Sequence, residues 1–237
     1  MTMTNKDWII ISLVSLGAFL LTRKVFGESP SMLNPEIPLS LKNANPALLP
    51  IATTLNADEL RVMQYADIMM YEGQKQGIAP DVIAAIIRAE SSGIATATAY
   101  ESAVKSYSYG LMQLLLETAT WLKDLNSWLK YNKNPQTLLI PDVNIEIGTS
   151  YLAFQYKRYK KATFINPITD MIASYNAGSV PKGTAAQNDY TYTNSNGDPK
   201  VQAYVDKVML YKSRFRMMFE YLYSNYNDLF PASIWGR

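Results

Sequence analysis

The stretch that decides the fold runs from residue 80 to residue 93 and reads PDVIAAIIRAESSG. Pro80 suits the first turn of a helix, and the Ser-Ser-Gly run that follows Glu90 is a stop signal. Four apolar residues stand eight, seven, four and three positions before Glu90, and they share one helix face: Val82, Ile83, Ile86 and Ile87. Glu90 continues that stripe, so the pattern predicts a carboxyl group on the apolar side of a helix.

Two effects disfavour the ionised form of Glu90 at this position. An apolar environment penalises the charged form, and the carbonyl end of a helix repels an anion. Both effects raise the pKa of the carboxyl group, and a carboxylic acid that stays protonated near neutral pH can serve as a general acid. The alternative is that the last helical turn frays, so that Glu90 points into solvent as an ordinary surface residue.

The composition excludes several kinds of chemistry. The chain has 237 residues, 48% of them hydrophobic and 18% charged, which is typical of one globular domain with appendages. It contains no cysteine and no histidine, which excludes disulfides, thiol nucleophiles, Ser-His-Asp triads and nearly all zinc sites. The net charge of +2 argues against a nucleic-acid partner. We therefore expect no metal and no cofactor, and acid chemistry that rests on Asp, Glu, Tyr or Lys.

An uncharged apolar run, WIIISLVSLGAFLLT, occupies residues 8–22. Its length corresponds to roughly 22 Å of helix, against about 30 Å of bilayer hydrocarbon. Trp8 at one end and Arg23 with Lys24 at the other suit the two membrane interfaces. We expect residues 1–26 to form a transmembrane anchor that contacts lipid through residues 8–22. A signal peptide is the alternative.

Three further segments follow the anchor. Residues 27–53 are rich in proline and lack helical periodicity, so they are interpreted as a linker. Residues 54–230 form the predicted domain, and residues 231–237 form a C-terminal tail. Six helices are predicted in the domain, the second of which carries Glu90: residues 56–74, 80–91, 113–130, 142–161, 167–176 and 200–224. A short strand or two is expected between residues 93 and 109. The fold class is therefore mainly α, with at most a minimal β element.

A short motif, SYGLMQL, spans residues 108–114. Gly110 permits close approach of the backbone to a partner or ligand. Leu111 and Met112 are suited to an apolar wall, and the Gln113 amide offers both donors and an acceptor. The motif on its own is equally compatible with a helix start that carries core residues.

A second motif, SYNAG, spans residues 174–178. It ends a predicted helix with a phenol, Tyr175, and a carboxamide, Asn176, just before Gly178. A helix cap with a packing aromatic residue is the ordinary interpretation of this pattern.

Taken together and in order, these pieces resemble the lytic transglycosylase domain of the soluble-lytic-transglycosylase (SLT) type, within the lysozyme-like superfamily. The resemblance covers roughly residues 56–222 and implies an α+β lysozyme-like fold. It rests on five ordered matches: Glu90-Ser91; Gly110 to Leu114 with Thr118-Ala119; Asn144, Ile145, Gly148, Tyr151 and Leu152; Tyr175 to Gly178; and Tyr204, Val205 and Val208. The chain departs from the family where Ser92-Gly93-Ile94 replaces an Asn-Pro pair and where Leu115-Leu116 replaces Met-Pro.

The resemblance implies cleavage of the β-1,4 bond between N-acetylmuramic acid and N-acetylglucosamine in peptidoglycan, the expected partner. In that family one glutamate acts first as acid and then as base, and a 1,6-anhydro ring closes. By position Glu90 is this acid/base. The remaining assignments are substrate-binding residues, Ser91, Ser108, Gln113, Tyr175 and Asn176, and structural motif residues, Gly110, Leu111, Met112, Asn144, Gly148, Gly178 and Tyr204. Gln113 and Asn176 are expected to bind the sugars, and Tyr175 to orient Glu90 or an acetamido group.

Several alternatives stay open at the level of sequence. A muramidase hydrolase like the goose-type lysozymes needs a second carboxylate, for which Glu101, Glu117, Asp124 and Asp142 are candidates. A non-catalytic peptidoglycan-binding membrane protein and a helical nucleic-acid-binding module are the other two. The flanking charges favour a cytoplasmic location for the bulk of the chain. A phage virion membrane, with local wall opening at entry, reconciles this bias with a substrate outside the cytoplasm. If the bias is too small to set the topology, we expect a bacterial inner membrane facing peptidoglycan.

Overall fold

The computed structural model describes residues 55–102, 104–160, 166–178, 200–223, 225–231 and 235. The predicted membrane anchor (1–26) and linker (27–53) lie outside these residues. Within the described part of the chain, no helix is both long and apolar enough to cross a membrane. Of the predicted tail, Trp235 is buried and stacks on Tyr156, with ring centroids 5.1 Å apart.

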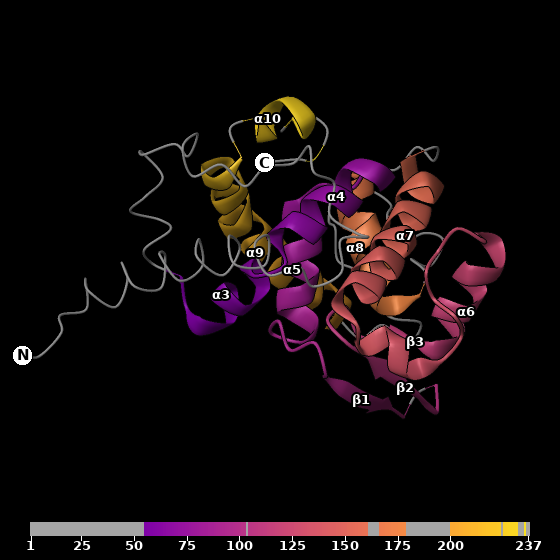
Figure 1. Cartoon of the computed structure of the whole chain (residues 1–237). Coiled ribbons are helices and arrows are strands. Elements are labelled where there is room, and N and C mark those ends of the chain that lie inside the picture. Colours follow the sequence, from indigo (N-terminus) through magenta and orange to yellow (C-terminus); the bar gives the residue numbers. More distant parts are fainter. Residues whose placement is uncertain are drawn as a thin grey trace, which may run out of the picture.

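Helices dominate the described chain, as the sequence predicts (Figure 1). In chain order the α-helices are α3 (Ala57–Met63), α4 (Ala66–Gln76), α5 (Pro80–Glu90), α6 (Leu116–Leu125), α7 (Pro141–Lys160), α8 (Pro167–Ala177), α9 (Lys200–Leu222) and α10 (Tyr226–Leu229). A 3-10 helix, η3 (Pro135–Leu139), precedes α7. Three short strands, β1 (Thr98–Glu101), β2 (Ser106–Tyr109) and β3 (Leu114–Leu115), form one antiparallel sheet in the order β1-β2-β3.

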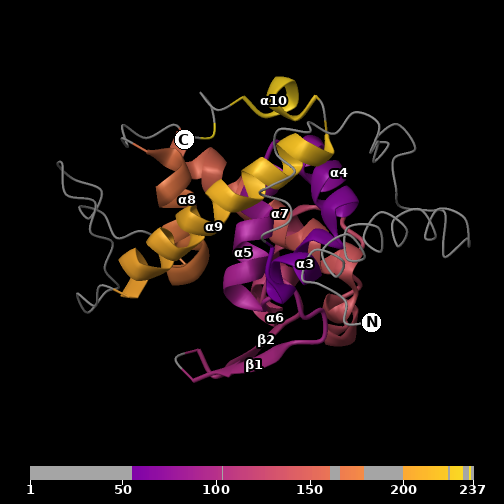
Figure 2. The same cartoon turned by 90° about the vertical axis from the view of Figure 1, so that its left-hand side faces the viewer.

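The helix that carries Glu90 lies in the middle of the molecule. Figures 1 and 2 show α9 running along one side of α5, and α4 and α3 also pack against it. Every residue from 80 to 87 is buried, not only the stripe that the sequence marks. A helix that is apolar on all sides is stable only when it is surrounded in this way. The position of α5 therefore places its last residue, Glu90, where the helical core meets the sheet.

Two predicted helices differ from the observed ones. The helix expected over residues 56–74 begins correctly, because Asn56 and Glu59 form a capping box, but it is broken between α3 and α4. There the N–H of Tyr65 bonds to the carbonyl of Val62, three residues back, and the chain bends. The helix expected over residues 113–130 is shorter, because Gln113 has a positive φ of 45° and the next two residues pair with β2.

Candidate functional site

Glu90 keeps its helical position at the end of α5, so the fraying alternative is wrong. Its side chain is partly buried, and burial is the main cause that raises the pKa of its carboxyl group. The hydroxyl of Tyr204 donates a hydrogen bond of 2.5 Å to Glu90 Oε1, which lowers this pKa, as does the charge of Lys207. The charge of Glu101 raises it. The balance leaves the pKa above its usual value, so the carboxyl group retains its proton to higher pH than an exposed glutamate.

Tyr204 has a larger part in the site than the sequence predicts. The sequence motif marks it only as a structural residue, whereas in the structure its hydroxyl contacts the carboxyl group of Glu90. The ring is 8% exposed, and burial with the nearby charge of Glu90 raises the pKa of the phenol well above its usual value. Tyr204 therefore stays protonated and remains a hydrogen-bond donor. No local pattern links two residues that lie 114 positions apart, so only the fifth family match pointed to this residue.

Tyr175 lies near the acid, although its hydroxyl has another partner. The charge of Glu90 contributes to raising the pKa of Tyr175, after burial. The hydroxyl itself donates a 2.7 Å hydrogen bond to the carbonyl of Met112, and the ring packs against Tyr151 at 5.5 Å between centroids. Tyr175 thus connects α8 to the SYGLMQL motif. Its neighbour Asn176 is exposed at the end of α8.

Gln113 and Ser108 stabilise the loop that leads from α5 through the sheet. The side-chain nitrogen of Gln113 donates to the carbonyls of Ala97, at 3.1 Å, and Gly110, at 2.8 Å. Its oxygen accepts a 2.8 Å bond from the hydroxyl of Ser108, which also lies 3.2 Å from Glu101 Oε1. Both amide hydrogens of Gln113 therefore have partners inside the protein, and one oxygen lone pair remains for a ligand.

Ser91 joins the end of α5 to the same motif. Its side chain is buried, and its hydroxyl lies 2.7 Å from the carbonyl oxygen of Leu111 and 3.2 Å from that of Ile87. Leu111 and Met112, which the sequence offers as an apolar wall, are completely buried in the core. Ser91 therefore fixes the position of Glu90 relative to the motif.

Asn144 holds three separate segments together at the start of α7. Its side-chain oxygen accepts a 2.8 Å hydrogen bond from the backbone N–H of Met112. Its nitrogen donates to the carbonyl of Tyr109 at 2.9 Å and to that of Leu138 at 2.7 Å. The residue is completely buried; its bonds to Met112 and Leu138 are buried, and its bond to Tyr109 is partly buried. One amide thus connects the sheet, the SYGLMQL motif and η3.

The motif glycines are required by close packing. Gly110 has a φ of 75°, and a Cβ there would collide with the carbonyl oxygen of Leu138 and with the amide of Asn144. A Cβ on Gly148 of α7 would collide with the sulfur of Met112. Gly178 ends α8 at a φ of 74°, with open space around it. The first two glycines allow α7 to contact the motif directly.

The four candidates for a second carboxylate have different surroundings in the structure. Only Glu101 among them contributes to the pKa of Glu90. Glu117 accepts hydrogen bonds from the hydroxyl of Ser106, Asp124 pairs with Lys133, and Asp142 lies in the first turn of α7. The residues that the structure describes contain no group of three or more His, Cys, Asp and Glu side chains that could hold a metal ion.

These features, a buried central helix that ends in an acid beside a small sheet, are those of a lysozyme-like fold, and comparison with known proteins identifies the family. The model of the Transglycosylase SLT domain matches residues 67–197, more than half of the chain. The chain belongs to this family.

Individual relatives agree with the family match. The chain is 31% identical over 134 residues to the soluble lytic murein transglycosylase of Escherichia coli K12, covering 54% of this chain and 19% of that protein. It is 36% identical over 95 residues to the endo-type membrane-bound lytic murein transglycosylase A of Enterobacter sp. (strain 638), covering 39% and 43%. The crystal structure of the 70 kDa soluble lytic transglycosylase from Escherichia coli is similar, with a TM-score of 0.56 and 26% identity over 80% of this chain and 30% of that one. The chain thus spans about a fifth of the first relative and less than half of the second.

Proposed function

We propose that the protein is a peptidoglycan lytic transglycosylase whose single acid/base is Glu90. The observation that carries this proposal is the contact between Tyr204 and the Glu90 carboxyl group at the end of the buried helix α5. Membership of the Transglycosylase SLT domain family and the names of the relatives support it. Among the described residues, Glu90 is also the carboxyl group whose own pKa burial raises and whose charge acts on both Tyr204 and Tyr175.

In the proposed reaction, Glu90 first gives its proton to the glycosidic oxygen between N-acetylmuramic acid and N-acetylglucosamine. The bond from C1 of the muramic acid to that oxygen breaks, and N-acetylglucosamine leaves as an alcohol. The Glu90 carboxylate then takes the proton of the muramic acid C6 hydroxyl. The oxygen of that hydroxyl bonds to C1, which closes the 1,6-anhydro ring. Glu90 ends protonated as it began, and no water is consumed.

The neighbouring residues suit the two halves of this cycle. Burial favours the protonated acid of the first step. The hydrogen bond from Tyr204 favours the carboxylate that exists between the steps, and it keeps the carboxyl group in place. We propose that Asn176 and the free lone pair of Gln113 bind the sugars, with Ser108 lining the site. Tyr175 and Ser91 act by fixing the motif around Glu90.

Digestion of purified peptidoglycan, with the products weighed by mass spectrometry, tests the proposal. We expect products with anhydro ends from the protein and no products from the Glu90→Gln variant, which retains the fold. Glu117→Gln is the matched control, because this exposed carboxylate is hydrogen-bonded to Ser106 and should be dispensable. Undiminished activity of Glu90→Gln would refute the assignment of the acid. A folded, inactive parent that still binds the polymer would instead favour the non-catalytic alternative.

A hydrolase remains the second candidate, because Glu101 on β1 acts electrostatically on Glu90. A second carboxylate at a suitable distance can activate water, and the product is then heavier by one water than the anhydro form. The same mass measurement therefore separates the two reactions. A hydrolase that uses Glu101 as its base would also lose activity in Glu101→Gln, whereas the transglycosylase should keep it.

We propose further that residues 1–26 anchor the domain to a membrane, either in a phage virion or in the bacterial inner membrane. The composition of residues 8–22 supports an anchor, and one relative is named as membrane-bound. Extraction of membranes with alkaline carbonate tests it: the full chain should stay in the pellet, and release into the supernatant would contradict an anchor. Detection of the protein in purified virions supports the viral location, and detection only in host envelopes rejects it.

A further inference from the structure

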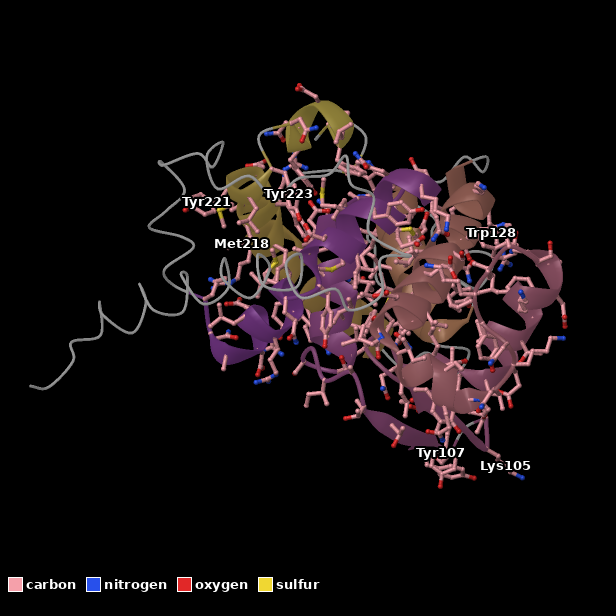
Figure 3. The ribbon with its side chains drawn as sticks, in the orientation of Figure 1. Lys105, Tyr107, Trp128, Met218, Tyr221 and Tyr223 are labelled. Carbon is pink, nitrogen blue, oxygen red and sulfur yellow. The ribbon has the colours of Figure 1, made fainter. Side chains whose placement is uncertain are left out.

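A groove of about 420 Å3 lies among α4, α6 and α7, and the proposed mechanism does not use it. We call it the α6–α7 groove. Residues that line it include two aromatic residues, Trp128 and Phe154, and two lysines, Lys75 and Lys157. Figure 3 shows Trp128 on the side of the molecule formed by α6 and α7, well away from the hairpin end that carries Lys105 and Tyr107.

The groove lies on a different face of α7 from the candidate active site. Tyr151 of α7 packs against Tyr175 of α8. The side chain of Gln155, also on α7, donates a 3.4 Å hydrogen bond to the carbonyl oxygen of Gly178, just after α8. Ala153 and Lys157, which line the groove, stand two residues away from these positions. Two residues correspond to about 200° around a helix. The groove and Tyr175 therefore contact different faces of α7, so a ligand in one does not occupy the other.

The groove presents two exposed aromatic rings. Trp128 is 50% exposed and Phe154 is 39% exposed. Lys75 fixes the surroundings of Trp128, because its Nζ lies 4.3 Å from the centroid of the indole and 3.1 Å from Glu146 Oε1. The side chains of Gln76 and Ser150 bond to each other at 2.5 Å. These contacts engage the polar groups of the wall. Phe154 packs edge to face against Trp121, with ring centroids 4.9 Å apart, and the Trp128 and Phe154 rings both keep exposed surface.

One cation in the groove remains available for a ligand. Lys75 already has two carboxylate partners, Glu72 and Glu146. Lys157 is exposed, and no carboxylate of another described residue lies within ion-pair distance of it. A ligand that suits this surface has flat apolar faces for the rings and an anionic group for Lys157. Flat aromatic faces and a cation without a carboxylate partner are complementary to an acidic saccharide.

We infer that the α6–α7 groove is a second peptidoglycan-binding site, in which sugar rings lie against Trp128 and Phe154 and a carboxylate of the same polymer pairs with Lys157. The inference rests on the proposed function, because peptidoglycan is the carboxylate-bearing glycan that the protein would meet. The volume of the groove is within the range of small-ligand sites, about 300–1,000 Å3. Two linked contacts on one polymer raise the effective concentration of the glycan at Glu90. The groove therefore matters most on the insoluble cell wall.

Binding is tested with the full chain carrying Glu90→Gln, so that cleavage does not remove the polymer. Variants are pelleted with purified peptidoglycan sacculi, and the bound fraction is measured. Trp128→Ala and Lys157→Glu should each weaken binding by about tenfold, the change that corresponds to roughly 1.4 kcal/mol. Trp128→Phe should restore most of the binding. Arg158→Glu is the matched control, since it makes the same charge change at the next, exposed position of α7, and it should bind within about twofold of the parent.

Insoluble chitin, a neutral glycan, separates the contribution of the Trp128 ring from that of the Lys157 charge. Binding to chitin should be weakened by Trp128→Ala and should be insensitive to Lys157→Glu. Unchanged binding of sacculi by both variants would overturn the inference. An equal loss in Arg158→Glu would overturn it as well, because the effect would then be one of general charge.

Turnover in the chain with Glu90 intact gives an independent test. Trp128→Ala should lower product release from sacculi more than turnover of a soluble tetrasaccharide, which is too short to reach both sites. Equal losses on both substrates would contradict a separate site. The proposed function fails in a different way, through activity that survives Glu90→Gln, whereas a failure of this inference appears as unchanged binding in Trp128→Ala and Lys157→Glu.

Discussion

Asn144 is the residue whose replacement should show most clearly how the site is held together. Replacing it with alanine removes three hydrogen bonds at once, and it leaves three backbone groups without their partners. Two of these bonds, to the Met112 N–H and the Leu138 carbonyl, are buried, and the bond to the Tyr109 carbonyl is partly buried. A small cavity also replaces the amide.

The size of the effect follows from these contacts. A buried backbone group that loses its partner costs about 1–3 kcal/mol. Partial rescue by water at the Tyr109 end lowers the sum, so we expect Asn144→Ala to reduce the free energy of unfolding by about 3–5 kcal/mol. Such a loss is a large part of the roughly 5–15 kcal/mol that holds a typical domain together. The variant should therefore lose cleavage activity at temperatures where the parent is fully folded.

Urea unfolding followed by circular dichroism measures this loss, provided that the slope with denaturant is unchanged. Asn134→Ala is the matched control, because Asn134 is an exposed cap of η3 whose side chain accepts one hydrogen bond, from the N–H of Gln136. It should cost about 1 kcal/mol. If Asn144→Ala destabilises the protein no more than Asn134→Ala does, the buried amide does not hold the three segments together and our description of the scaffold is wrong.

Three further predictions concern the acid and the backbone around it. Tyr204→Phe removes a hydrogen bond that lowers the pKa of Glu90, so the pKa should rise and the alkaline limb of the pH profile of kcat/KM should move to higher pH; an unmoved limb argues against the contact. Glu101→Gln removes a negative charge that raises the same pKa, so that limb should move to lower pH, and a shift to higher pH would contradict the electrostatic assignment. Gly110→Ala should cost about 3 kcal/mol of stability, because backbone strain and the collision of the new Cβ add together. Gly77 has a similar positive φ but open space around it, so Gly77→Ala should cost only about 1 kcal/mol. Equal losses in urea unfolding would show that the collision at residue 110 is relieved.

Local patterns predict the elements around Glu90 well, because their causes are local. The proline at residue 80, the apolar stripe and the glycine stop determine where α5 begins and ends. The capping box at Asn56 and the left-handed Gly77 mark the two ends of the α3–α4 region in the same way. The bend between α3 and α4 is not visible in the sequence, because Tyr65 has ordinary helix-forming neighbours and its turn is fixed by packing.

Long-range contacts explain what the sequence does not reveal about the site. β3 exists because Leu114 and Leu115 pair with β2, and without that partner the two leucines suggest a helix. The partner of Glu90 comes from α9, at Tyr204, and no spacing rule connects the two residues. At Gln113 the sequence suggests a role in binding sugars and does not reveal a structural one. Both hydrogens of its amide bond to the carbonyls of Ala97 and Gly110, which stabilises the loop.

The central claim is that Glu90 holds a proton in the pH range of the proposed cleavage of peptidoglycan. Infrared difference spectroscopy between the protein and Glu90→Gln, recorded as a function of pH beside the activity, measures this directly. Glu72 and Asp81, whose pKa values burial also raises, cancel in the difference. We predict a carboxylic acid band that Glu90→Gln lacks and that disappears in the same pH interval as the activity. A Glu90 carboxyl group that is ionised throughout the active range would contradict the account.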